Sequence, residues 1–169
     1  MPTHYDGIHR STYTVTGSLA DASATIQQRT EAGKASWDST YSYNQEDGTI
    51  TAATITSVLR IEMPEWSGYS AASQRDKDEW DRFWAALDVH EQGHISLAQS
   101  FLDNADQALV GYPESEAQSR FDAFMAGVQT ESDGYDADTG HGVYYGSFIT
   151  VEDESSESES SEYEQTTES

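Results

Sequence analysis

The sequence predicts an α+β domain, in which a small antiparallel sheet packs on one long helix and on a second helix nearer the C-terminus. Up to about residue 63, apolar and polar residues alternate in short runs bounded by Gly and Pro, a pattern typical of strands. From about residue 74 onward, apolar residues recur every three or four positions, which indicates helices. The 169 residues suffice for one domain with a core of ordinary size.

The first elements are short. Residues 1–9 read as a flexible leader, and the domain itself is expected over residues 10–150. Alternation over residues 12–16 predicts a short strand. Ser18 then provides the N-cap of a helix that ends near Gly33.

A β-hairpin is expected next. Residues 37–43 alternate aromatic and polar side chains, and Glu46-Asp47-Gly48-Thr49 supplies the turn. The return strand runs to Met63, and Pro64 is expected to stop it because proline cannot donate to a sheet ladder.

Two helices and a short strand complete the predicted domain. Ser73 is the N-cap of the long helix, which is expected to run to about Leu109. The second helix buries apolar residues between Ala117 and Val128. Residues 132–142 are rich in turn formers, and an aromatic strand over residues 143–149 closes the domain.

The long helix contains His90-Glu91-Gln92-Gly93-His94, which is an HExxH motif. Because four residues advance a helix by slightly more than one turn, His90 and His94 lie on one face. Two neutral imidazoles in this arrangement can hold one Zn²⁺, and Glu91 can reach a water on the metal as general base. All three residues interrupt the apolar stripe of the helix on its own face, so they are expected to point inward. Since an inward carboxylate is costly without a cation, the motif predicts one Zn²⁺ per chain.

The composition is strongly acidic. The chain has 31 acidic and 8 basic residues, a formal charge of −23 and a pI near 4.1. With no basic patch, nucleic acid and anionic membranes are excluded as partners. Residues 152–169 contain eight carboxylates and no base, and the segment 151–169 is expected to form a disordered Ser/Glu-rich tail. Residues 1–151 retain 23 acids against 8 bases, or −15, which favours a halophilic protein whose charges are screened by salt.

The chain has no cysteine, so any metal must be held by His, Asp or Glu. No apolar run approaches transmembrane length, and the first ten residues lack the hydrophobic region of a signal peptide. We therefore expect a soluble protein, cytoplasmic in a salt-adapted organism, or secreted if a signal was removed. Nothing in the sequence indicates an oligomeric state.

A zinc site on this helix needs a third protein ligand. No His follows the motif within residues 95–106, and His141, between two glycines, is the next one along the chain. Asp136 is the main rival, either as a ligand or as an acceptor that orients a zinc-bound imidazole. Glu114 and Glu116 are weaker rivals, because acidic residues are common in the first turn of a helix.

The ordered motifs resemble a known family. They are Tyr13-x-Val15-x-Gly17, Trp37, Met63-Pro64-x-Trp66, the HExxH motif and Tyr135-Asp136-x-x-Thr139-x-His141-Gly142. Over about residues 10–145 the chain is similar to the bacterial and archaeal family described as predicted secreted zinc-dependent proteases, formally a domain of unknown function; the acidic body favours a halophilic archaeal member. The resemblance implies a zincin-like fold, His90, His94 and His141 as zinc ligands, and Glu91 as the catalytic residue.

Three functions follow as hypotheses. The first is a zinc metallopeptidase that acts on a peptide or protein substrate, with Tyr135 and Tyr144 as candidate donors to the transition state. The edge of the strand ending at Met63 is then expected to bind an extended substrate by strand addition. The second is a non-catalytic, zinc-stabilised binding module with a closed metal shell. The third is a protein that binds partners through its acidic tail.

Overall fold

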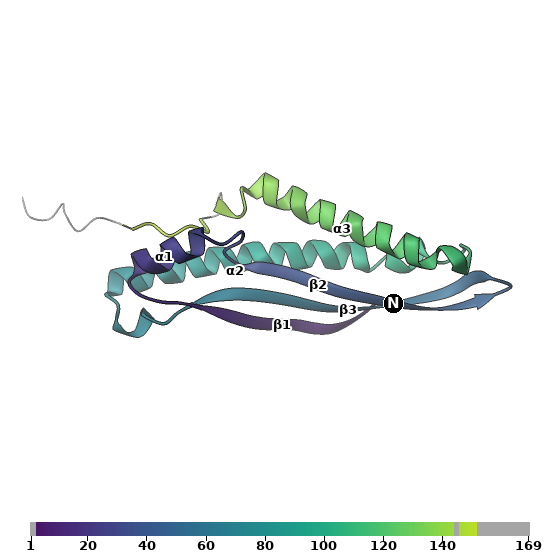
Figure 1. Ribbon diagram of the computed structural model, residues 1–169, viewed down its shortest axis with the longest axis horizontal. Helices are drawn as coiled ribbons and strands as arrows, with labels where there is room; N and C mark the ends of the chain where they lie inside the picture. Colours follow the sequence, from purple (N-terminus) through teal and green to yellow (C-terminus); the bar gives the residue numbers. More distant parts are fainter. Residues whose placement is uncertain (1–2, 144–145, 152–169) are drawn as a thin grey trace, which may run out of the picture.

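The longest strand, β3 (Thr49–Trp66), lies in the centre of a three-stranded sheet of order β1-β3-β2. The computed structural model describes residues 3–143 and 146–151 (Figure 1). Strand β2 (Lys34–Glu46) pairs with β3 antiparallel, and β1 (Thr3–Val15) pairs with β3 parallel. The predicted α+β class is confirmed, but the sheet is mixed and not purely antiparallel, because β1 pairs parallel to β3. The chain passes from β1 through α1 to β2 at the other edge, and only then into the central β3.

The core forms between the sheet and the long helix α2 (Gln74–Leu102), which lies along the sheet (Figure 1). Alternate residues of β3 face this core, and fully or almost fully buried ones include Ile55, Leu59, Ile61 and Met63. The apolar stripe of α2 packs against these residues. Its buried residues are Trp80, Phe83, Leu87, Ile95, Ala98 and Leu102. Both periodicities read from the sequence therefore point to the same interface.

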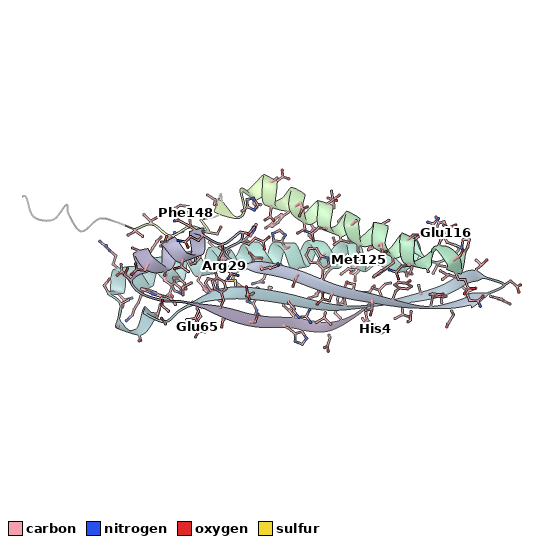
Figure 2. The ribbon with its side chains drawn as sticks, in the orientation of Figure 1. His4, Arg29, Glu65, Glu116, Met125 and Phe148 are labelled. Atoms are coloured by element: carbon pink, nitrogen blue, oxygen red, sulfur yellow. The ribbon has the colours of Figure 1, made fainter. Side chains whose placement is uncertain are left out.

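Helix α3 (Ala117–Thr139) lies along α2 (Figure 1), and its first turns also meet β2, where the rings of Phe121 and Tyr41 have centroids 4.7 Å apart. Its own residues Phe121 and Val128 are buried, and its Met125, labelled in Figure 2, packs against the core. The helix ends at Gly140, which adopts the left-handed conformation (φ 57°) that glycine accepts without a steric cost.

The remaining elements are short. Helix α1 (Leu19–Gln27) has the predicted N-cap, since the Ser18 side chain accepts from the Asp21 N–H and Asp21 accepts from the Ser18 N–H. The 3₁₀ turns are η1 (Tyr69–Ala71), η2 (Ala105–Ala108) and η3 (Glu114–Glu116). No helix among the described residues is both long and apolar enough to cross a membrane.

Several predicted boundaries of strands are corrected. Residues 3–9 belong to β1, so the leader expected over residues 1–9 is wrong for that part. Strand β3 continues past Pro64 to Trp66. The pairing of β3 with β2 ends where Lys34 lies opposite Glu62. No residue of β2 therefore lies beside Pro64 to require the N–H that proline lacks.

The edge expected to bind substrate is also corrected. Because β3 is paired on both sides, the strand that ends at Met63 has no open edge along most of its length. The open edges of the sheet belong to β1 and β2 instead.

Three helix boundaries differ from the prediction as well, and the first is that α1 ends at Gln27 and not near Gly33. Helix α2 ends at Leu102, and the apolar spacing that suggested a longer helix continues in η2, where Ala105 and the following Leu109 are buried. Residues 132–139, expected to be turns, form the last two turns of α3. Their turn-forming composition is overridden by contacts with α2.

The last segment does not form the predicted strand in its described part. Residues 143 and 146–149 are not assigned to a strand, and the segment is held by side chains of α2. Arg82 donates to the carbonyls of Gly146 (2.9 Å) and Phe148 (2.6 Å), and Glu79 accepts from the Thr150 N–H. Of the tail expected over residues 151–169, residues 152–169 lie outside the described residues.

Candidate metal centre

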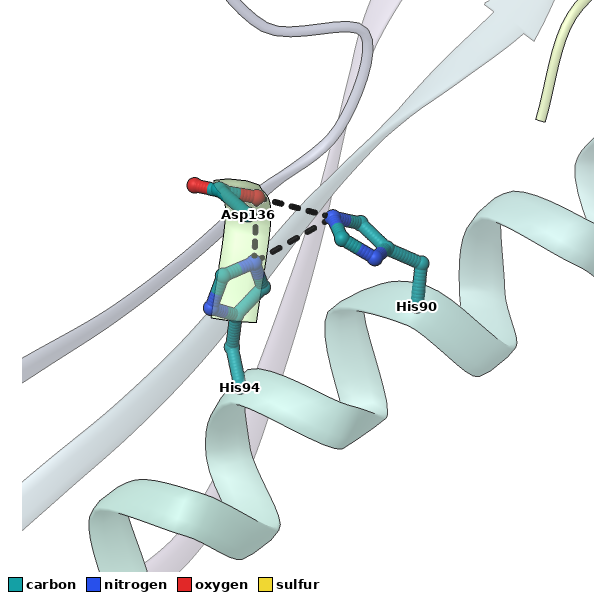
Figure 3. A group of neighbouring side chains, drawn as sticks. All are labelled: His90, His94 and Asp136. Atoms are coloured by element: carbon teal, nitrogen blue, oxygen red, sulfur yellow. Dashed lines mark hydrogen bonds and ion pairs between the residues drawn. The ribbon is translucent and has the colours of Figure 1, made fainter. Parts of the chain in front are cut away.

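Three side chains from two helices converge at one site (Figure 3). His90 and His94 project from the same face of α2, and Asp136 comes from the facing side of α3. The Asp136 Oδ1 atom lies 3.1 Å from His90 Nε2 and 3.0 Å from His94 Nε2. The two Nε2 atoms are 3.2 Å apart. Both imidazoles are buried, while the Asp136 side chain is partly accessible.

This triangle has the dimensions of a metal site. Ligand atoms about 2.0–2.1 Å from a tetrahedral zinc ion are separated from one another by roughly 3.3 Å. Among the described residues, His90, His94 and Asp136 form the group of candidate ligands whose atoms come this close. Two imidazoles and one carboxylate are also ligand types that suit zinc. The residues present therefore fit the metal that the motif predicts.

Burial favours the neutral form of His90. Removal from solvent, and then the neighbouring His94, lower the pKa of His90 below its ordinary value, against the opposing effect of Asp136. A metal binds the neutral imidazole, so this shift leaves the Nε2 lone pair available.

The outer nitrogens of both imidazoles contact hydroxyl groups of α3. His94 Nδ1 lies 2.7 Å from Ser132 Oγ, and His90 Nδ1 lies 3.5 Å from Thr139 Oγ1. Both hydroxyl residues are buried. Each imidazole is thus held between Asp136 on its inner side and a hydroxyl on its outer side.

Tyr135 packs against the two imidazole rings. Its ring stacks on His90 with centroids 5.2 Å apart and meets His94 edge-on at 4.8 Å. Its hydroxyl end lies over Gly93 of α2. The ring thus covers one side of the two histidines.

Glu91 points toward the start of β2. It is 4% exposed, and its carboxyl accepts a hydrogen bond from the backbone N–H of Ala35. Gly33 lies so close that a Cβ atom there would be 2.7 Å from Glu91 Oε1. Burial raises the pKa of the Glu91 carboxyl to about 8, although the Ala35 N–H acts in the opposite direction. A cation in the adjacent site would favour its charged form.

A groove of about 250 Å³ gives access to these groups. One wall is the segment 31–37, which leads into β2, and the other is α3, with Gln129, Ser132 and Asp136. The floor consists of His90, Glu91, His94 and Leu87 of α2. The buried polar groups of the two helices therefore meet solvent at one place.

His141 occupies a different position from the one predicted for a third ligand. Its side chain is 73% exposed, and its Nδ1 atom lies 3.6 Å from Asp136 Oδ1. The backbone of His141 is left-handed (φ 54°), between Gly140 and Gly142. Of the two residues considered for the third ligand, the structure brings Asp136 into the group with the two histidines and leaves His141 beside it.

The other candidates are placed as follows. Glu114 and Glu116 are exposed in η3, which packs at the hairpin end of the sheet, where the Glu114 N–H donates to Gly48. Tyr144 lies outside the described residues. Tyr135 lies at the centre, as a ring packed on the histidines.

Ser132 and Thr139 were not among the predicted site residues. Together with Tyr135 and Asp136 they follow the spacing i, i+3, i+4, i+7, which places four side chains on one helical face. That signal was present, but the surrounding Gly and Asp residues suggested turns.

Residues 10–142 match the family DUF922, described as a bacterial protein of unknown function. The chain belongs to DUF922. The matched range includes both the HExxH motif on α2 and the Ser132–Thr139 face of α3. No curated protein matches the chain, and no solved structure matches it.

Proposed function

We propose that this DUF922 protein is a zinc-dependent peptidase. The observation that carries the proposal is the convergence of His90, His94 and Asp136 beside a buried Glu91, at the floor of a groove open to solvent. An HExxH helix with a third ligand from a distant segment is the arrangement that zinc peptidases require.

His90, His94 and Asp136 would hold the metal through Nε2, Nε2 and Oδ1. Zinc at this position would supply a Lewis acid that polarises a peptide carbonyl and makes water more acidic. With three protein ligands, a zinc ion there would keep one further position for water.

Glu91 would act as the general base. Its carboxylate would take a proton from the attacking water and pass it to the leaving nitrogen. The Ala35 N–H and the close packing on Gly33 fix the direction in which this carboxylate points. Such positioning contributes to rate because the reacting groups are held in place before the reaction.

The substrate would bind as an extended strand along β2. The segment 31–37 forms a wall of the groove, and β2 pairs with β3 on its other side only. In an antiparallel ladder, alternate residues direct their N–H and C=O groups to the same side. Since the Ala35 N–H points to Glu91 on α2, Trp37 would offer its backbone groups to the groove as well.

A second candidate is a non-catalytic module in which zinc only joins α2 to α3. The observation in its favour is that His141 Nδ1 lies within 3.6 Å of Asp136 Oδ1, close enough for a small movement to close the metal shell. A four-ligand shell without an open position would be structural. The two functions differ in whether bound zinc supports hydrolysis.

The test combines zinc content with hydrolysis of a mixed peptide library. The native protein is expected to carry one zinc ion and to cleave peptides. Glu91→Gln keeps the size of the side chain but cannot take up a proton, so it should retain zinc and lose roughly 10²-fold or more in rate. Glu131→Gln, at an exposed position of α3, is the matched control and should match wild type. A zinc-loaded wild type without any cleavage would favour the binding module.

A further inference from the structure

We propose that Ser132 and Thr139 are positioning residues that fix the protonation pattern of the two histidines. Each hydroxyl would accept a hydrogen bond from Nδ1–H of one imidazole, so that both Nε2 lone pairs face Asp136. This inference rests on the metal centre of the proposed function and concerns how the protein prepares it.

The hydroxyl proton of Thr139 is donated to a backbone carbonyl and not to His90. Its hydroxyl donates to the Tyr135 carbonyl at 2.8 Å, with the Asp136 carbonyl at 3.4 Å on the same side. The Gly142 N–H donates to the same oxygen at 3.3 Å, and His90 Nδ1 lies 3.5 Å away. Because a hydroxyl has a single proton, Thr139 can interact with His90 only as an acceptor. His90 then carries its proton on Nδ1, and its Nε2 atom is a bare acceptor.

Ser132 is the corresponding neighbour of the outer nitrogen of His94. Its hydroxyl is 5% exposed and lies 2.7 Å from His94 Nδ1, within ordinary hydrogen-bond distance. The other nitrogen, Nε2, lies 3.0 Å from Asp136 Oδ1 and 3.2 Å from His90 Nε2. When Nε2 binds a metal, Nδ1 must carry the proton, and Ser132 is the group placed to accept it.

The consequence is a cluster of acceptors with no proton between them. Two Nε2 lone pairs and one carboxylate oxygen within 3.2 Å repel one another, and a cation relieves the repulsion at all three atoms. The two hydroxyls therefore disfavour the alternative in which an Nε2–H group donates to Asp136 and blocks the site. Partners of this kind typically contribute about 10- to 100-fold to metal affinity.

A single face of α3 supplies the carboxylate and both hydroxyls. Ser132, Asp136 and Thr139 are spaced i, i+4 and i+7 on α3, so the ligand and both hydroxyls move together as one rigid unit. The same helix presents Tyr135 between them, packed on both rings. Docking of α3 onto α2 thus sets the position and the tautomer of the histidines at once.

The test measures zinc affinity of the full chain by competition with a chelating dye. Ser132→Ala and Thr139→Val remove the hydroxyls with little change in shape, and each should raise the zinc dissociation constant about 10- to 100-fold. Thr139→Ser restores the hydroxyl and should restore the affinity. Thr130→Val is the matched control, because Thr130 makes the same bond to the carbonyl four residues earlier (2.9 Å to Ala126) but is exposed. It should bind zinc like wild type.

A second readout reports the hydrogen bonds directly. In zinc-loaded protein labelled with ¹⁵N-histidine, the Nδ1 protons of His90 and His94 should give slowly exchanging signals in NMR spectra. Ser132→Ala should accelerate exchange at His94, and Thr139→Val at His90. Dissociation constants and exchange rates that match the Thr130→Val control in both variants would overturn the inference.

The outcome is separable from that of the proposed function. If zinc binds with the expected pattern but no peptide is cleaved, the positioning roles stand and the peptidase proposal fails. If wild type cleaves peptides and both hydroxyl variants bind zinc normally, the peptidase stands and the positioning roles fail.

Discussion

The hydroxyl end of Tyr135 occupies the space beside Gly93 that any larger residue would fill. A Cβ atom at Gly93 would lie 2.6 Å from the ring carbon that carries the hydroxyl. Gly93 lies between His90 and His94 on α2, and Tyr135 stacks on the His90 ring and meets the His94 ring edge-on. The glycine in the middle of a helix, which costs about 1 kcal/mol relative to alanine, thus makes room for the ring that packs the site.

Gly93→Ala is therefore expected to displace Tyr135 and the imidazoles that it covers. Overpacking of this kind typically costs about 1–3 kcal/mol, which outweighs the gain in helix propensity. The variant should have a lower melting midpoint and a weaker zinc affinity than wild type. Gly127→Ala, in α3 with no atom within 4 Å of the added Cβ, is the control and should be neutral or slightly stabilising. Equal behaviour of the two variants would contradict the packing role of Gly93.

Gly33→Ala is expected to separate metal binding from catalysis. The added Cβ would lie 2.7 Å from Glu91 Oε1 and 2.9 Å from its Cγ, so the carboxylate must move. His90 and His94 do not contact Gly33 in this way, and zinc affinity should change little. If Glu91 is the base, the turnover number should fall at least about tenfold, because misplaced catalytic groups lose rate steeply. A variant that keeps full turnover would show that the packing of Glu91 against Gly33 does not matter for the reaction.

Much of the first half of the site could be predicted because it is local. The spacing of His90, Glu91 and His94 places them on one side of a helix whatever surrounds it, and Ser73 marks where that helix begins. Alternation in β3 identified its buried face in the same way. These features depend on the repeat of a single element and need no knowledge of its neighbours.

The second half depends on tertiary contacts. Residues 132–139 contain Gly134 and several Asp residues, which favour turns when taken alone. They remain helical because Tyr135, Asp136 and their neighbours pack against α2. The extent of α3 also determines which side chain joins the two histidines. Because the helix ends at Thr139, Asp136 faces the histidines and His141 lies beyond the last turn. In the same way, the alternation of polar and apolar residues in β1 does not indicate that β1 pairs with β3 in parallel.

Salt adaptation remains a prediction. With a formal charge of −15 over residues 1–151, mutual repulsion should destabilise the fold where screening is weak. The screening length falls from about 30 Å at 0.01 M salt to about 3 Å at 1 M. Melting midpoints of a chain ending at residue 151 should therefore rise between about 0.01 M and about 2 M KCl. A midpoint that stays constant or falls would exclude a halophilic origin of the charge.

The last prediction decides the third ligand. Asp136 Oδ1 lies within 3.1 Å of both Nε2 atoms, whereas the His141 side chain is exposed and its Nδ1 lies 3.6 Å from Asp136 Oδ1. Asp136→Ala should therefore abolish tight zinc binding, and His141→Ala should leave it largely intact. Zinc that binds only the folded state raises the free energy of unfolding by about 4 kcal/mol at 1,000 times its dissociation constant.

Thermal melts with and without zinc test this without any substrate. Wild type and His141→Ala should gain stability on zinc addition, and Asp136→Ala should not. Asp133→Ala, at an exposed position of α3 with no contact to the histidines, controls for the loss of one negative charge. If His141→Ala loses the zinc response while Asp136→Ala keeps it, the third ligand is His141, and the left-handed turn at residues 140–142 must swing its imidazole inward when the metal binds.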